Sequence, residues 1–213
     1  TLDPQPRDIV LDVCAAPGGK SFTAAERMQN RGKIFSCDLY DHKLRLMREG
    51  AQRLGILILA VSKRDAAFGP MLPTADRILC DVPCSGLGVM AKKPEIRYKK
   101  LADFERLPEI QLEILEKSSA YVKSGGVLVY STCTILPEEN EMQVKDFLKR
   151  HPEFELDKDD SWLPEHLKGK LQDGMLQLLQ IGYGPFPVKL HGCLADSPLG
   201  LGSETQCAND QHC

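Results

Sequence analysis

The sequence predicts an α/β domain in which helices cover both faces of a twisted, mostly parallel sheet. Short apolar runs of strand length alternate with amphipathic segments of helix length between residues 9 and 150, which is typical of parallel sheets. The composition supports a packed core, because 42% of the 213 residues are hydrophobic and 27% are charged. The charge balance excludes a polycation of the histone type, since 27 Lys and Arg stand against 30 Asp and Glu.

The first half of the domain is predicted to hold three strands and two helices. Residues 9–13 form an apolar strand that ends in a Pro-Gly-Gly turn, and a helix follows over about 19–28. A second strand covers 33–37. Residues 41–54 form a helix, because their apolar side chains recur at spacings of three and four until Gly55 ends the pattern. A third strand covers 56–61.

The second half continues the alternation after a longer irregular stretch. Residues 77–80 form a fourth strand, and residues 82–100 follow without a periodic pattern. A helix is expected from Pro108, a residue that suits a first helical turn, to about residue 122. A fifth strand covers 127–130, and Pro137 opens a last helix that reaches Arg150.

The chain is expected to be a cytoplasmic fragment of a longer protein, with no membrane as partner. No apolar run approaches the roughly 18 residues of a membrane span. The first residues lack the basic region and apolar core of a signal peptide. The sequence starts at Thr1 rather than at Met, and the first predicted strand arrives at once.

The cysteines argue against a metal site and against a disulfide framework. Eight are present, and none forms the Cys-x-x-Cys pair expected of zinc ligands. A chain that can bury its own core has little need of structural disulfides. Five of the cysteines lie in or just after strand-like runs: Cys14, Cys37, Cys80, Cys84 and Cys133.

Acidic and thiol side chains gather at the carboxyl ends of the predicted strands. Ligands of such sheets bind beyond these ends, near the point where the strand order reverses. The residues found there are Asp12, Cys14, Asp38, Asp65, Asp81, Cys84 and Cys133. Their convergence predicts an active site at this edge of the sheet.

The first strand leads into a turn of small residues that fits a nucleoside cofactor. The turn and the helix start comprise Cys14, Ala15, Ala16, Pro17, Gly18, Gly19 and Lys20. Glycine lets the backbone approach a ligand closely, and free amides at a helix start favour a negative group. The spacing is not Gly-x-Gly-x-x-Gly, which disfavours a nicotinamide dinucleotide. Asp38, at the end of the second strand, is placed to accept hydrogen bonds from ribose hydroxyls, whereas Asp41 is the better helix cap. A nucleoside without a pyrophosphate indicates S-adenosylmethionine.

Three motifs closely resemble those of the Sun/Fmu-type RNA (cytosine-5)-methyltransferases. They are the turn of residues 14–20, the stretch Asp81-Val82-Pro83-Cys84-Ser85-Gly86, and Tyr130-Ser131-Thr132-Cys133-Thr134 followed by Pro137-Glu138-Glu139-Asn140. The resemblance runs from Ile9 to Arg150 and is strongest to the bacterial enzymes that act on 16S ribosomal RNA. It implies a Rossmann-like fold dependent on S-adenosylmethionine, with ribosomal RNA as the partner.

Methylation of cytosine C5 explains why two cysteines accompany this cofactor. Cytosine C5 is a weak nucleophile until a thiolate adds to C6, so the enzyme needs an activated cysteine and a means of release. Chemistry alone leaves Cys84 and Cys133 as rivals for the attack. The resemblance implies that Cys133 attacks and that Cys84 assists product release. It further implies that Asp81 contacts cytosine and cofactor, that Lys20 reaches the catalytic centre, and that Asp65 lies near the adenine.

A basic stretch follows the Pro-Cys motif. Residues 90–100 read MAKKPEIRYKK, and the predicted RNA contacts are Lys92, Lys93, Arg97, Tyr98 and Lys99. Cationic side chains neutralise phosphates and an aromatic ring stacks on an unpaired base, so this stretch suits single-stranded or loop RNA.

The match to the family departs at both ends. Further RNA-binding regions that normally precede the catalytic domain are absent, and residues 1–180 are expected to form that domain alone. Residues 181–213 lack a periodic segment, so we expect an atypical, irregular tail and a sheet without its closing strand. Two alternatives stay open: a DNA cytosine-5 methyltransferase with Cys84 as nucleophile, and an inactive cofactor-binding RNA scaffold.

Overall fold

The structure, a computed structural model, describes residues 2–100, 102, 104–161, 163, 165–177 and 186–192. Within these residues the centre of the molecule is a sheet of seven strands in the order β3-β2-β1-β4-β5-β7-β6. In that order the strands are β3 (Leu59–Lys63), β2 (Lys33–Asp38), β1 (Ile9–Asp12), β4 (Ala75–Asp81), β5 (Val122–Thr132), β7 (Phe186–Gly192) and β6 (Phe154–Leu156). Strands β1 to β5 pair in parallel, and β7 is antiparallel to both of its neighbours. The predicted fold class is therefore confirmed.

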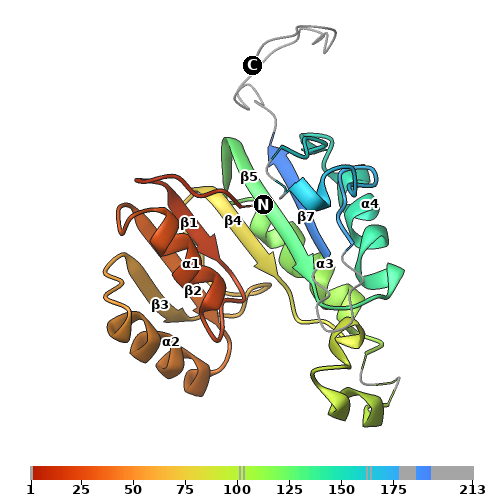
Figure 1. Ribbon diagram of the computed structural model, residues 1–213, viewed down its shortest axis with the longest axis horizontal. Helices are drawn as coiled ribbons and strands as arrows, with labels where there is room; N and C mark the ends of the chain where they lie inside the picture. Colours follow the sequence, from red (N-terminus) through yellow and green to blue (C-terminus); the bar gives the residue numbers. More distant parts are fainter. Residues whose placement is uncertain are drawn as a thin grey trace, which may run out of the picture.

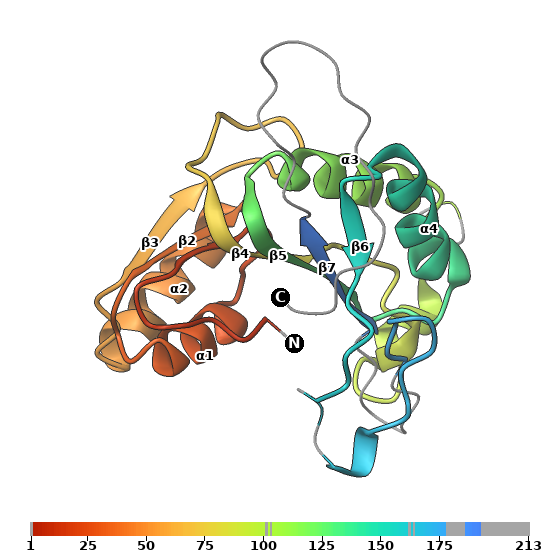
Figure 2. The same ribbon diagram turned by 90° about the horizontal axis from the view of Figure 1, so that it is seen from above.

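Helices cover both faces of this sheet, as Figures 1 and 2 show. Helices α1 (Gly19–Arg27) and α2 (Asp41–Arg53) lie on one face, and α3 (Leu107–Ser119) and α4 (Glu141–Arg150) lie on the other. The largest apolar cluster fills the space between the sheet and α3 and α4. Smaller clusters lie under α1 and α2. No helix in the described part of the chain combines the length and the apolar character needed to cross a membrane.

The predicted elements occur in the predicted order, with shifted ends. Strand β5 starts at Val122 rather than at residue 127, and a register shift beside Ala75 accommodates the extra residues. The last predicted helix is split into the short η4 (Pro137–Glu139) and α4, because Asn140 leaves the helical region with φ −117° and ψ −107°. The irregular stretch contains two short 3-10 helices, η1 (Leu87–Val89) and η2 (Pro94–Tyr98). The sequence pattern missed the three-residue β6 altogether.

The expectation that the sheet lacks a closing strand is wrong. Residues 186–192 form β7, which pairs with β5 from Thr132 to Val127. Val188 and Leu190 are fully buried on one side of β7, and Lys189 on the other pairs with Asp157 at 2.7 Å. This alternation is that of a strand, but it is short and lies among glycines and prolines that mimic a loop. The rest of the expected tail, 181–185 and 193–213, lies outside the described residues, and a domain boundary near 180 stays a prediction.

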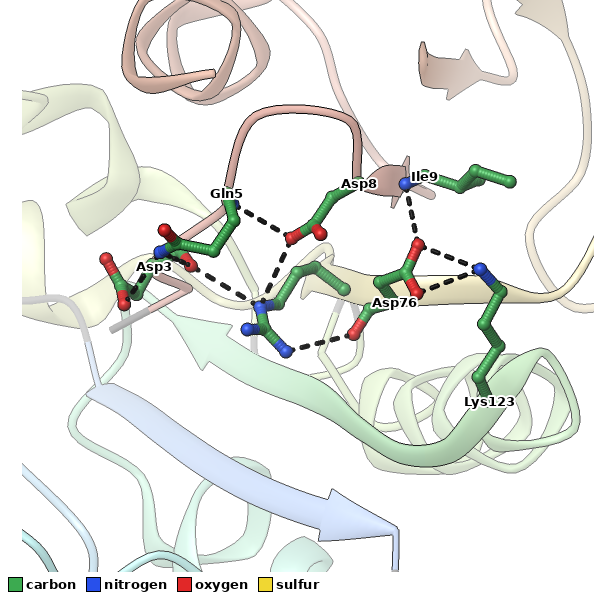
Figure 3. Close-up of polar contacts among 7 residues, drawn as sticks. Asp3, Gln5, Asp8, Ile9, Asp76 and Lys123 are labelled. Atoms are coloured by element: carbon green, nitrogen blue, oxygen red, sulfur yellow. Dashed lines mark hydrogen bonds and ion pairs between the residues drawn. The ribbon is translucent and has the colours of Figure 1, made fainter. Parts of the chain in front are cut away.

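At the amino ends of the strands, a polar network joins β1, β4 and the start of β5 (Figure 3). The carboxylate of Asp76 accepts the N–H of Ile9 at 2.8 Å and is paired with Lys123 at 2.8 Å. Asp8 accepts the N–H of Gln5 at 2.9 Å in the approach to β1. These contacts hold together the end of the sheet opposite the predicted site.

Candidate active site

Two cysteines meet at the carboxyl edge of the sheet. The sulfur atoms of Cys84 and Cys133 lie 3.1 Å apart, and the N–H of Cys133 donates to the Cys84 sulfur, also at 3.1 Å. Cys84 lies in the loop after β4 and Cys133 in the loop after β5, which are adjacent parallel strands. The structure therefore brings together the two rivals that the sequence singled out.

The two thiols differ in acidity. The hydrogen bond with Cys84 lowers the pKa of Cys133 to about 7, and the charges of Lys93 and Lys20 act in the same direction. Burial and the charge of Asp81 oppose this shift. The same hydrogen bond and burial raise the pKa of Cys84 far above its usual range. Cys133 is therefore the more acidic thiol of the pair and the one more readily ionised near neutral pH.

A close backbone approach holds the Cys133 loop in place. The N–H of Gly88 donates to the carbonyl of Cys133 at 3.0 Å. A Cβ on Gly88 would lie 2.9 Å from that same carbonyl oxygen, so only glycine fits without a shift. The loop after β4 is thereby fastened to the loop after β5.

Asp81 and Lys20 form an ion pair beside the cysteines. The Nζ atom of Lys20 lies 2.6 Å from Oδ2 of Asp81, and the hydroxyl of Ser131 donates to Oδ1 at 2.7 Å. Lys20 is half exposed at the start of α1, whereas Asp81 ends β4. Both predicted residues lie at the same edge as the thiols, and Ser131 is a contact that sequence reasoning did not identify.

The turn between β1 and α1 has the predicted tight geometry. Gly18 has φ +108°, and a Cβ there would overlap the ring of Phe22 at 2.5 Å. Its N–H donates to Ala15 at 2.7 Å, while Ala15 donates to the carbonyl of Cys37 in β2 at 2.8 Å. Gly19 is exposed and has no neighbour within 4 Å of a Cβ position. An open surface therefore remains over the amides that begin α1.

The remaining turn residues and the two predicted cofactor aspartates differ in their surroundings. Cys14 is half-buried, and burial raises its pKa, so it is not a reactive thiol. Asp38 is buried and accepts the N–H groups of Ala16 at 3.3 Å and Tyr40 at 3.1 Å. The Oδ1 atom of Asp65 accepts hydrogen bonds from two N–H groups of its own loop, so Oδ2 is the atom that would contact a cofactor.

The basic stretch lies next to the cysteines. Ile96, at its centre, is buried and lies 3.0 Å from the Cβ position of Gly86, two residues after Cys84. The predicted RNA contacts around it are exposed: Lys92, Lys93, Arg97, Tyr98 and Lys99. Because Ile96 anchors the segment, its charged face is held at the mouth of the site.

The sequence analysis assigned no individual role to three buried residues at this edge. Asp12 accepts the hydroxyl of Ser21 at 2.7 Å, and burial raises its pKa to about 7. Gln111 and Glu139 lie under the Cys84 loop. Glu139 was inside a recognised motif and Asp12 was placed at a strand end, whereas nothing in the helix that holds Gln111 distinguished it. In the described residues no cluster of three His, Cys, Asp or Glu is arranged to hold a metal ion.

The family described as 16S rRNA methyltransferase RsmB/F matches residues 1–181. A relative from Bacillus subtilis (strain 168), a probable ribosomal RNA small subunit methyltransferase B, is 46% identical over 188 residues, covering 86% of this chain and 42% of the relative. A protein of the same name from Synechocystis is 37% identical over 182 residues, covering 84% and 41%. The chain thus spans about two fifths of the length of these curated relatives.

Solved structures show the same likeness. NSun6 from Pyrococcus horikoshii with SFG superposes with a TM-score of 0.78 at 32% identity, covering 90% of this chain and 49% of that one. A methyltransferase homolog protein from Pyrococcus horikoshii gives a TM-score of 0.72 at 30% identity, covering 90% and 63%.

Proposed function

The chain belongs to the RsmB/F family of 16S rRNA methyltransferases, and from this premise we propose that it methylates C5 of a cytosine in ribosomal RNA. The methyl donor is S-adenosylmethionine, and Cys133 forms a covalent adduct with cytosine C6. The observation that carries the proposal is the contact of the two sulfurs at 3.1 Å, in which Cys133 is the more acidic thiol.

The turn after β1 fits S-adenosylmethionine. Gly19 leaves the start of α1 uncovered, and the amides there suit the carboxylate of the methionine part. Asp38 lies at the end of β2, where a buried carboxylate accepts the ribose hydroxyls. When bound, the cofactor supplies an electrophilic methyl group. A relative in the same fold was solved with SFG, an analogue of this cofactor.

Different residues of the chain then act in different steps of the reaction with cytosine. The Cys133 thiolate adds to C6, which makes C5 nucleophilic. The ion pair of Lys20 and Asp81 lies beside the ring and orients it by hydrogen bonds. After methyl transfer, the C5 proton passes to a water molecule, the C5–H electrons restore the C5–C6 double bond, and the C6–S electrons leave with Cys133 as a thiolate. The S–H of Cys84 stabilises that leaving sulfur, because the two sulfurs already lie within hydrogen-bond distance, at 3.1 Å, in the free protein.

The RNA contacts are proposed for the exposed face of the basic stretch. Lys92, Lys93, Arg97 and Lys99 face phosphates, and Tyr98 offers a ring on which a base can stack. The target base must leave its stack before a sulfur at this edge can reach C6. Ribosomal RNA as substrate places the protein in the cytoplasm.

The test is covalent capture of RNA. The chain, a 16S rRNA transcript and S-adenosylmethionine labelled in the methyl group are incubated together. Cys133→Ala should abolish methylation and adduct alike, whereas Cys84→Ala should accumulate an adduct that survives denaturing gels. Cys37→Ala, which alters a buried cysteine beside Ser62, is the matched control and should methylate normally. An adduct formed by Cys133→Ala would reverse the roles and favour the chemistry of the DNA enzymes.

A further inference from the structure

A buried amide and a buried carboxylate lie directly under the loop that carries Cys84. The Nε2 atom of Gln111, from α3, donates to the carbonyl of Pro83 at 2.9 Å and to Oε2 of Glu139 at 2.7 Å. The same Oε2 accepts the N–H of Ser85 at 2.9 Å. The peptide groups on both sides of Cys84 are therefore held by one amide–carboxylate pair, which we call the clamp.

The clamp continues into the segment that carries Cys133. The hydroxyl of Tyr130 donates to the main-chain carbonyl of Glu139 at 2.7 Å. The hydroxyls of Ser85 and Thr134 lie 2.6 Å apart. Tyr130 and Thr134 stand three residues before and one residue after Cys133. The two cysteine loops are thus fixed against one set of buried groups.

This arrangement begins where the sheet stops holding the chain. The β4–β5 ladder extends as far as the N–H of Val82, which donates to Ser131 at 3.1 Å. Beyond it the carbonyl of Pro83 and the N–H of Ser85 bond to the clamp instead. Gln111 and Glu139 are 0% and 1% exposed, so water does not compete for these bonds.

From this geometry we propose that Gln111 and Glu139 are positioning residues that set the Cys84 thiol against the Cys133 sulfur. They touch neither cytosine nor cofactor, and they act through the backbone of the Cys84 loop. The consequence for product release rests on the proposed function, but the consequence for the reactivity of Cys133 does not. The S–H of Cys84 stabilises the Cys133 thiolate only while the loop keeps the two sulfurs in contact.

The reactivity of Cys133 can be measured without RNA or cofactor. The full chain is treated with iodoacetamide over a range of pH, and alkylation is followed for the Cys133 peptide by mass spectrometry. Gln111→Met keeps the size and neutrality of the side chain and removes both donors. The midpoint of the Cys133 profile should move up by about one pH unit, toward the about 8.5 of a free thiol.

Two further variants separate positioning from stability. Gln143→Met is the matched control, because Gln143 is also a buried amide that donates to the main chain of η4, at the carbonyl of Glu138, 2.8 Å away. Its melting temperature should fall as that of Gln111→Met does, with the alkylation midpoint unchanged. Glu139→Gln retains an oxygen that can accept both clamp bonds, so its midpoint should not rise.

The outcomes decide the proposal. A raised midpoint in Gln111→Met but not in Gln143→Met or Glu139→Gln supports positioning. Equal midpoints in Gln111→Met, Gln143→Met and the unaltered chain overturn it and leave the clamp a purely stabilising feature. With 16S rRNA and S-adenosylmethionine, Gln111→Met should also accumulate covalent complex, as Cys84→Ala does. If Cys84→Ala gives no complex while the midpoints behave as expected, the proposed function fails and the clamp stands.

Discussion

The sulfur of Cys84 lies 3.1 Å from the sulfur of Cys133, although 49 residues separate them in the chain. Parallel pairing of β4 and β5 sets Asp81 opposite Ser131, so both loops leave the sheet at the same level. Each cysteine follows within three residues of these partners. The contact is thus a product of strand register, and it places a proton donor beside the thiolate that the proposed chemistry requires.

Because the two sulfurs already touch, mild oxidation should join them. One hydrogen peroxide takes two hydrogens from the thiols, forms the disulfide and leaves as two waters. Treatment with one equivalent should give a linked Cys84–Cys133 peptide in a non-reducing digest, with loss of alkylation at Cys133. Dithiothreitol should restore both.

The control for this oxidation is Cys84→Ser. Without a second thiol, Cys133 should stop at the sulfenic acid, which a dimedone probe detects. Recovery of sulfenic acid on Cys133 in the unaltered chain, with no linked peptide, would show that the loops cannot reach disulfide geometry.

Periodicity was enough to predict the central part of the fold. Apolar runs marked β1, β2, β4 and β5 because most of their residues are buried between helices on both faces, and such strands read as continuous hydrophobic stretches. The edge strand β3 is only partly buried, and its observed range starts three residues after the predicted one. A search for continuous apolar runs did not find β7, because only alternate residues of this strand, such as Val188 and Leu190, are fully buried. Pairing with β5 over six residues, not local pattern, fixes β7 as a strand.

The residues of the candidate site were likewise only partly predictable from the sequence. Its residues at strand ends, such as Asp81 and Cys133, follow from topology, because parallel strands bring their carboxyl ends to one edge. Gln111 could not be predicted, since its role depends on α3 packing across the Cys84 loop. Asp12 was placed at the edge, but its complete burial and its bond to Ser21 emerge only from the packed structure.

Asp38→Ala should weaken cofactor binding by about 1–3 kcal/mol, the range for a lost hydrogen bond to a charged group. Titration calorimetry with S-adenosylhomocysteine measures this. Asp41→Ala is the control, because that carboxylate is exposed and pairs with Lys63 on the surface. An unchanged dissociation constant for Asp38→Ala would remove Asp38 from the site.

Neighbouring glycines in the cofactor turn should respond oppositely to alanine. Gly18→Ala places a Cβ on a residue with φ +108° and into the ring of Phe22, which should cost about 1–3 kcal/mol of unfolding free energy. Gly19→Ala meets open space at the start of α1 and should be neutral or stabilise by up to about 1 kcal/mol. Urea unfolding of both variants checks this, and equal effects would contradict the turn geometry.

Removing charge from the basic stretch should weaken RNA binding without affecting the cofactor. Arg97→Ala with Lys99→Ala removes two exposed cations, so the slope of log K against log salt should fall by roughly 1.5 for single-stranded RNA. Tyr98, 88% exposed, should contribute about 1–3 kcal/mol through stacking, which Tyr98→Ala removes. An unchanged salt slope together with an unchanged affinity would place the RNA elsewhere.

Asp12 should make the protein less stable as the pH rises from about 4 to 7. Burial raises its pKa in the folded state from 3.8 to about 7, with the charges of Asp81 and Asp38 acting in the same direction. Between these two values the folded state keeps a proton that the unfolded state has released, so the free energy of unfolding falls with increasing pH.

Asp12→Asn removes the titratable carboxyl group and keeps the shape of the side chain. The unfolding free energy of the variant minus that of the unaltered chain should therefore rise by about 2–3 kcal/mol between about pH 5 and pH 8. Subtraction cancels the groups common to both, including His151, whose pKa is raised because its bonds to Glu116 and Glu153 outweigh burial. Parallel stability curves would show that the pKa of Asp12 is not raised in the folded state.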